Sequence, residues 1–464
     1  MAFIPQPPPS RAPYRPVDAI AEVADFLADP VGAARFPETK LRFRNQRWAE
    51  AVGLGELSDD AWLAHFGHFE ALDGSLPQPL ALRYHGHQFR VYNPEIGDGR
   101  GFLFAQLRDG RDRLLDLGTK GSGQTPHSRF GDGRLTLKGG VREVLATEML
   151  EALGVNTSKT FSLIETGEAL ERGDEPSPTR SAVMARLSHG HIRIGSFQRL
   201  AYLRGDEALR RLVAYSLRHY YGDDGEGDDA PVRLLRQVVA ATAALAASYM
   251  AAGFVHGVLN SDNINISGES FDYGPWRFAP TWDPAFTAAY FDHAGLYAFA
   301  RQPEAIHWDA AQLAIALRTL VEAEPLVEAL DGFGAAYQAA LTDRVLWRLG
   351  LQPRGPEADR ALVQAFEAGL LASGEGVDRA YFDWRSGRWR REGEPHAAFA
   401  DFAALAEAHT AAPLTHPYWS EAEPCSMLID EVEAIWAPIA QDDDWSAFEA
   451  KVAAIRRMGD ALRA

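Results

Sequence analysis

Apolar residues recur at helical spacing most clearly between Val232 and Ala252. Leu235, Val238, Val239, Leu245 and Tyr249 share one wide stripe, which predicts an amphipathic helix that ends at Gly253. Similar spacing predicts helices over residues 19–27, 59–66, 141–153, 308–322, 326–341 and 357–371, and over most of 425–464. The chain after about residue 196 is therefore expected to be mainly helical.

Alternating apolar and polar positions predict strands in the first part of the chain. Residues 101–107 and 113–117 flank an Arg-Asp-Gly-Arg turn and predict an antiparallel hairpin, and further strands are expected over 160–165 and 181–187. The chain therefore has strands first and helices afterwards, with a polar loop directly after a long helix. This is the order of elements in a two-lobed kinase fold. We predict an α+β, two-lobed protein-kinase-like fold, with an N-terminal extension (1–80), a nucleotide-binding N-lobe (81–195) and a helical C-lobe (196–464).

Composition narrows the environment in which the protein works. The 464 residues carry a formal net charge of −18, which argues against nucleic acid or an anionic membrane as the main partner. Cys425 is the one cysteine, so an intrachain disulfide is impossible. No apolar run reaches the roughly 18 residues of a membrane span. The Pro-rich first 16 residues lack the apolar core of a secretory signal and are expected to form an extended arm. We expect a cytoplasmic protein.

Residues 254–275, FVHGVLNSDNINISGESFDYGP, follow the long helix directly and carry the strongest candidate chemistry. We interpret them as a short buried strand, a polar loop, a second strand and a turn. His256, Asn263 and Asp272 have the spacing of a kinase-type catalytic loop, in which an Asn and an Asp hold the metal. Val258 stands where such a loop has its base, whereas Asp262 directly precedes the Asn. A turn that bonds its own backbone is the alternative, but the joint spacing favours a site.

Glycines and basic residues earlier in the chain suggest a phosphate site. Gly97, Gly99 and Arg100 lie in a turn between strands, although Gly-Asp-Gly is also an ordinary hairpin turn. Lys120 ends the next strand, where kinases place a phosphate-binding lysine, and a basic stretch with Asp132 and Gly133 follows.

Two glutamates on the helix predicted over 141–153 compete to pair with that lysine. Glu148 lies on the apolar stripe and is favoured by periodicity, whereas Glu143 lies about one face away. Three histidines, His189, His191 and His256, are expected to form hydrogen bonds, because no acidic or cysteine partner stands at a metal-ligand spacing.

Several motifs in order resemble the selenoprotein O family and its bacterial YdiU-type relatives. The resemblance covers about residues 80–320 and rests on RYHGHQF, GDGRG, TKGSGQTPHSRFGDGR, REVLATEML, HIRIGSF, HGVLNSDNINI, DYGPWRF and WDPAF. It implies a kinase-like fold with a reversed nucleotide, and transfer of AMP from ATP to Ser, Thr or Tyr hydroxyls of proteins.

The resemblance also implies roles for individual residues. Asp262 would be the base, Asn263 and Asp272 would hold Mg²⁺ or Mn²⁺, and Glu143 would pair with Lys120, which overrules the preference for Glu148. The nucleotide-binding residues would be Gly97, Gly99, Arg100, Lys120, Asp132, Gly133, Arg186, Arg193 and Asp272.

The chain departs from the family pattern at Arg90, Gln124 and His127, and past about residue 320 the likeness fades. Three other functions compete with AMP transfer. An ordinary phosphotransferase is disfavoured by Val258, and a silent nucleotide-binding scaffold is disfavoured by the retained Asn263 and Asp272. Transfer of UMP stays open.

Overall fold

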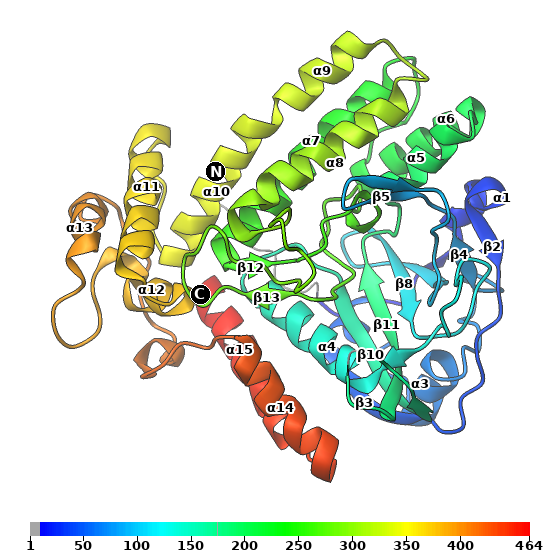
Figure 1. Ribbon diagram of the computed structural model, residues 1–464, viewed down its shortest axis with the longest axis horizontal. Coiled ribbons are helices and arrows are strands. Elements are labelled where there is room, and N and C mark those ends of the chain that lie inside the picture. The colour runs from blue at the N-terminus through cyan, green and yellow to red at the C-terminus, as the bar shows by residue number, and fades with distance from the viewer. Residues whose placement is uncertain (1–9, 174) are drawn as a thin grey trace.

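An antiparallel sheet dominates the first part of the chain in the computed structural model, which describes residues 10–173 and 175–464 (Figure 1). Helices make up most of the remainder, so the protein is mixed α/β, as expected from the patterning. The first nine residues of the expected Pro-rich arm lie outside the described residues.

Nine strands form the sheet, in the order β2-β4-β7-β8-β11-β10-β3, with β1 beside β7 and β9 beside β11. Three of them lie wholly within residues 10–80. The strands are β1 (Pro16–Val17), β2 (Ala28–Pro30), β3 (Lys40–Arg44), β4 (Leu80–Leu82), β7 (Leu103–Arg108), β8 (Leu114–Lys120), β9 (Leu135–Thr136), β10 (Lys159–Leu170) and β11 (Thr179–Ser188).

The predicted hairpin is confirmed as β7 and β8, which pair antiparallel from Leu103–Gly118 to Arg108–Leu114. Strand β8 ends at Lys120, as predicted, and the alternation recognised over 113–117 stops short of this end because every residue of the strand is buried. A strand buried on both faces shows little alternation. Lys120 therefore stands at the strand's end, opposite Met184 of β11.

Helix α4 (Leu137–Ala152) packs against β10 and β11 and is covered on another side by α15 (Ser446–Arg463). It begins one turn before the predicted start, because Thr136 caps it by accepting a hydrogen bond from the Gly139 amide at 3.1 Å. Glycines at 139 and 140 conceal that first turn from propensity.

Helix α7 (Ala230–Ala252) is the long helix expected before the polar loop, and it ends at Gly253, whose φ is +68°. It is the one helix among the described residues that is long and apolar enough to cross a membrane, and most of it is buried in the core. The other helices of eight or more residues are α3 (Asp59–Phe66), α5 (Ile194–Tyr202), α6 (Asp206–Ser216), α8 (Gln302–Leu317), α9 (Ala323–Asp331), α10 (Phe333–Leu349), α11 (Pro356–Ser373) and α14 (Ile429–Asp442).

Two helix predictions need correction. The segment 326–341 belongs to two helices, α9 and α10, which meet at Gly332. The segment 19–27 is a 3₁₀ turn (Ala19–Glu22) followed by the short helix α1 (Ala24–Leu27), separated by the non-helical Val23.

The prediction of two strands within 254–275 is wrong in its second half. Strand β12 (Phe254–Val255) pairs with β13 (Arg277–Phe278), which lies beyond the polar loop. The segment between them is irregular apart from a 3₁₀ turn (Ser261–Asn263), and Asn265 forms an isolated bridge to Arg193. The small hairpin of β5 (Gly86–Gln88) and β6 (Val91–Asn93) packs against this turn.

Candidate active site

A cavity of about 650 Å³ lies at the end of β8. Its walls come from the turn 96–101, the end of β8, the loop 127–134, and the two aspartates of the polar loop. All nine residues predicted to bind the nucleotide line it, together with Asp262. Glu143 and Asn263 are not in its lining. The volume is in the range typical of small-molecule sites.

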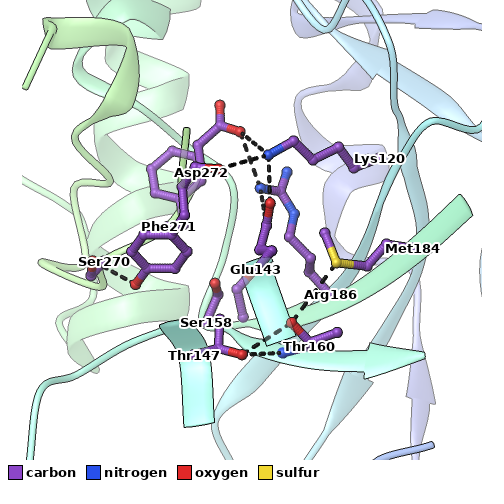
Figure 2. A network of polar contacts seen from close by, with 12 residues as sticks. Lys120, Glu143, Thr147, Ser158, Thr160, Met184, Arg186, Ser270, Phe271 and Asp272 are labelled. Atoms are coloured by element: carbon purple, nitrogen blue, oxygen red, sulfur yellow. Dashed lines mark hydrogen bonds and ion pairs between the residues drawn. The ribbon is translucent and has the colours of Figure 1, made fainter. Parts of the chain in front are cut away.

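Lys120 is anchored at the back of this cavity by a buried ion pair (Figure 2). Its Nζ lies 2.5 Å from Glu143 Oε2, and the two side chains are 4% and 1% exposed. Its Nζ is also 3.4 Å from Asp272 Oδ1. Pairing from a strand to the following helix fixes the ammonium group so that it faces the cavity.

The periodicity argument for Glu148 is wrong. Glu148 accepts two hydrogen bonds of 2.8 Å from Arg456 of α15, and Arg47 lies 3.2 Å away. Both glutamates are buried, because α4 is enclosed by the sheet on one side and by α15 on another. Amphipathic spacing cannot separate two positions that are both inside.

Asp272 lies among three cations. Its carboxylate is 3.4 Å from Lys120 and from Arg186 and 3.5 Å from Arg193. Burial opposes its ionisation, but these three charges outweigh burial and hold the pKa of Asp272 well below its ordinary value. The residue has a left-handed backbone with φ of +64°, which Asp tolerates better than most residues. The ionised form of this cavity-lining carboxylate is therefore favoured.

Asp262 has the opposite electrostatic character. It lies in the 3₁₀ turn, 7% exposed, and burial raises its pKa to about 6, although Arg193 partly offsets this. Its Oδ1 is buried and has no hydrogen-bond partner among the described residues. A carboxylate with a free oxygen and a pKa near neutrality is suited to accept a proton.

The β5–β6 hairpin fixes the position of this turn. The His87 amide donates to Ser261 Oγ at 2.7 Å, and the Phe89 amide donates to Asn260 Oδ1 at 3.0 Å. Gln88 Nε2 donates a long hydrogen bond of 3.5 Å to Asp262 Oδ2. These hairpin residues were not predicted as part of the site. The RYHGHQF motif was the available signal, since Gly86 and Gln88 lie within it.

Asp98 is a second contributor that sequence reasoning missed. Its Oδ1 accepts a hydrogen bond of 3.1 Å from Arg193, whose guanidinium also donates to the Asp262 carbonyl at 2.8 Å. The Arg193 guanidinium lies over the rings of Tyr84 and Phe271, at 4.3 and 4.8 Å from their centroids. The Gly97–Gly99 turn is therefore tied to the polar loop through Arg193.

Asp132, Gly133 and Arg100 also line the cavity. Asp132 accepts hydrogen bonds from Arg172 at 2.8 Å and from the Arg134 amide at 2.9 Å, which together outweigh burial and lower its pKa. Gly133 has φ of +71°, and a Cβ there would lie 2.2 Å from the Gly123 carbonyl carbon. Arg100 is exposed and has no ion-pair partner within the described ranges, so its guanidinium is available to an anion.

Asn263 and Asp272 carry oxygen donors of the type that a divalent metal binds together with phosphates. The Asn263 amide nitrogen donates to the Val258 carbonyl at 3.0 Å, which leaves the Asn263 amide oxygen as the free atom. This oxygen and the ionised Asp272 are the hard ligands that Mg²⁺ prefers, and such sites usually take further oxygens from phosphate and water. No group of three or more His, Cys, Asp or Glu side chains in the described part of the chain could hold a metal.

The three histidines form hydrogen bonds. His256 Nε2 is 3.0 Å from the Phe271 carbonyl, His189 Nδ1 is 2.7 Å from the Leu114 carbonyl, and His191 Nδ1 is 3.3 Å from Asp116. Burial lowers the pKa of His256. His256 thus joins the two ends of the polar loop through its contact with Phe271.

Comparison with known proteins assigns a family to this arrangement. The family model described as protein adenylyltransferase SelO matches residues 13–384. Proteins named protein nucleotidyltransferase YdiU are similar to the chain. That of Synechococcus elongatus is 42% identical over 97% of this chain and 96% of its own length, and that of Synechocystis is 41% identical over 94% and 96%. That of Pseudarthrobacter chlorophenolicus is 40% identical over 72% and 68%. The expectation that the likeness fades after residue 320 is therefore wrong.

Proposed function

Since the chain belongs to the SelO family of protein adenylyltransferases, we propose that it transfers AMP from ATP to Ser, Thr or Tyr hydroxyls of proteins and releases pyrophosphate. The observation that carries this proposal is the convergence of the nine predicted nucleotide-binding residues and Asp262 on one cavity. Glycine-containing turns and several cations there suit a triphosphate, whose charge is concentrated.

We propose that the fold is a two-lobed protein-kinase-like fold, with an extension over 1–80, an N-lobe over 81–195 and a helical C-lobe over 196–464. Support comes from the order of the active-site parts. A lysine at a strand end pairs with a glutamate on the next helix, and an Asn and an Asp follow after a long buried helix. Kinases arrange their catalytic parts in this order.

In the proposed reaction, the target hydroxyl oxygen bonds to the α-phosphorus while the bond from that phosphorus to the bridging oxygen breaks. Pyrophosphate leaves with the electron pair, and the hydroxyl proton passes to Asp262. The unpartnered Oδ1 of Asp262 is the acceptor, and a pKa of about 6 leaves it largely unprotonated at neutral pH. Lys120, Arg186, Arg193 and Arg100 stabilise the negative charge on the phosphates.

Asn263 and Asp272 would hold Mg²⁺ or Mn²⁺ next to the phosphates. A bound cation supplies neutralisation of phosphate charge. Lys120, Arg186 and Arg193 hold the pKa of Asp272 well below its ordinary value, which favours the negatively charged form that binds a cation. Val258 leaves the usual kinase base position without a titratable group, and this favours a nucleotide bound the other way round.

Cytoplasmic localisation is part of the proposal, with ATP and hydroxyl-bearing proteins as partners rather than nucleic acid or membrane. The net charge of −18 and the single cysteine support it.

The test uses ATP labelled at either the α or the γ position, with metal and a protein mixture. AMP transfer gives protein-bound label from the α position only, and label from the γ position alone would overturn it. UTP labelled at the α position, run in parallel, distinguishes UMP transfer. Asp262→Ala and Asp272→Ala are each expected to abolish labelling. ATP binding without any label would favour a silent scaffold.

A further inference from the structure

A second cavity, of about 580 Å³, adjoins the nucleotide cavity and shares Arg100, Lys120, Arg134 and Arg172 with it. We call it the basic groove. Its other walls come from the first turns of α4, the segment 273–277 that follows Asp272, and the segment 288–291, with Glu433 of α14 at one edge. None of the nine nucleotide-binding residues besides Arg100 and Lys120 lines it.

Cations exceed anions in this groove. Lys138 and Arg142 of α4 share one carboxylate, that of Glu433, at 2.7 and 3.9 Å. Arg277 has no ion-pair partner within 4.0 Å in residues 10–173 and 175–464. Glu175 is the other acidic residue of the lining, against seven basic ones, so a chain of net charge −18 keeps an excess of positive charge directly beside its active-site cavity.

The positions of Arg142 and Arg277 disfavour the charged forms of their side chains. Burial lowers the pKa of Arg142, and the neighbouring Arg277 guanidinium lowers it further. Burial also lowers the pKa of Arg277, with partial relief from Glu433 and Asp430. An anion bound between the two guanidinium groups would stabilise both charged forms.

Two exposed aromatic rings also line the basic groove. Tyr290 is 81% exposed and Phe291 is 42% exposed, and their rings are in contact with centroids 5.1 Å apart. Phe130, which is fully exposed, lies at the mouth of the neighbouring nucleotide cavity. Solvent-exposed aromatic side chains beside arginines are the composition that protein interfaces favour.

We infer that the basic groove binds a segment of the target polypeptide that carries Asp or Glu residues near the modified hydroxyl. This inference rests on the proposed function and names its substrate class. A polypeptide accounts for both the cations and the aromatic rings, and contact with Lys120 and Arg100 brings it to the edge of the nucleotide cavity. A nucleic acid would meet the repulsion of the whole acidic chain.

The test compares two fluorescent peptides that share one serine, flanked by glutamates in one and by glutamines in the other. Binding to the full chain is measured by anisotropy without ATP, so it does not depend on catalysis. The acidic peptide is expected to bind in a salt-sensitive manner and the neutral one to bind much more weakly. Equal binding of the two peptides would overturn the inference, and so would displacement of the acidic peptide by an oligonucleotide at lower concentration than by the unlabelled peptide.

Variants locate the binding to the groove. Arg142→Gln combined with Arg277→Gln is expected to weaken acidic-peptide binding about tenfold or more, as loss of charge-assisted contacts does. Tyr290→Ala, at an exposed position that cannot disturb the core, is expected to weaken both peptides. Arg236→Gln, on the exposed side of α7, is the matched control and is expected to have no effect.

Kinetics then separate this inference from the proposed function. In the double variant, the KM for the acidic peptide is expected to rise while the KM for ATP stays unchanged. A rise in the KM for ATP alone would instead make the groove part of the nucleotide site and overturn the inference. If no peptide receives AMP but the acidic peptide still binds in the groove, the inference stands and the proposed function fails.

Discussion

Replacing Gly86 with alanine is expected to displace the proposed base without touching the nucleotide. A Cβ on Gly86 would lie 2.8 Å from the Asp262 Cβ and 3.0 Å from its Oδ1. Carbon atoms in contact normally lie about 3.5–4.0 Å apart, so the two residues must separate by about 1 Å. The hairpin cannot simply lift away, because two of its backbone amides are hydrogen-bonded to Ser261 and Asn260.

A displacement of about 1 Å in a reacting group costs on the order of 100-fold in rate, which is about 2.7 kcal/mol in activation free energy. Gly86→Ala should therefore reduce the rate of AMP transfer at saturating ATP by about this factor. Transfer is followed with ATP labelled at the α position, ATP affinity is measured separately by calorimetry, and the melting temperature reports on the fold.

Gly334→Ala is the matched control, because a Cβ at this exposed glycine of α10 meets nothing within 4 Å. It should leave transfer unchanged. Wild-type transfer by a folded Gly86→Ala protein would refute the reasoning, since the base would then tolerate the shift. A loss of ATP affinity equal to the loss of rate would also refute it.

Further predictions concern pH, the two glutamates and the metal. The transfer rate should rise with pH through about 6 and level off above it, because Asp262 accepts the proton only when unprotonated. Gln88→Leu removes the hydrogen bond that stabilises the Asp262 carboxylate, so the midpoint of the pH–rate profile should move to higher pH. An unchanged profile would contradict this role of Gln88. Because the folded-state pKa of Asp262 is raised from 3.8 to about 6, the fold loses stability as pH rises between those values. Asp262→Asn should then increase the free energy of unfolding at pH 8 by up to about 3 kcal/mol and by little near pH 4. Equal denaturant midpoints of the variant and the wild-type protein at both pH 8 and pH 4 would count against this prediction. Glu148→Ala should lower the free energy of unfolding by about 3–5 kcal/mol, and with it the melting temperature, because its arginine contacts are lost. Glu143→Ala should instead raise the KM for ATP. The reverse pattern would mean that Glu148 is the partner of Lys120. Chelation by EDTA should stop labelling and added Mg²⁺ or Mn²⁺ should restore it, and undiminished labelling in EDTA would exclude the metal role of Asn263 and Asp272.

Local patterning predicted the elements that carry a clear local signal. Helix α7 was found from its apolar stripe and the glycine at its end, and the β7–β8 hairpin from the polar turn between two apolar segments. The division of 326–341 at Gly332 was missed, because a glycine within a periodic segment is compatible with a continuous helix.

Contacts between distant segments were beyond the reach of such patterns. Gln88 and Asp262 are 174 positions apart, and only the folded chain shows that one holds the other. Glu143 and Glu148 are both buried, so their roles depend on which basic residue faces each of them. The family resemblance assigned Glu143, Asp262 and the cavity-lining residues, because those positions are defined by motif rather than by periodicity.

The packing of α15 against α4 has a consequence for protein synthesis. Every residue that lines the nucleotide cavity is translated before Pro275. Arg456 donates two hydrogen bonds to Glu148 of α4, the helix that also carries Glu143, and it lies 308 positions after Glu148. A growing chain therefore contains the complete set of reactive side chains while α4 still lacks its outer support. We expect nucleotide transfer to begin only once α15 has left the ribosome and packed against α4.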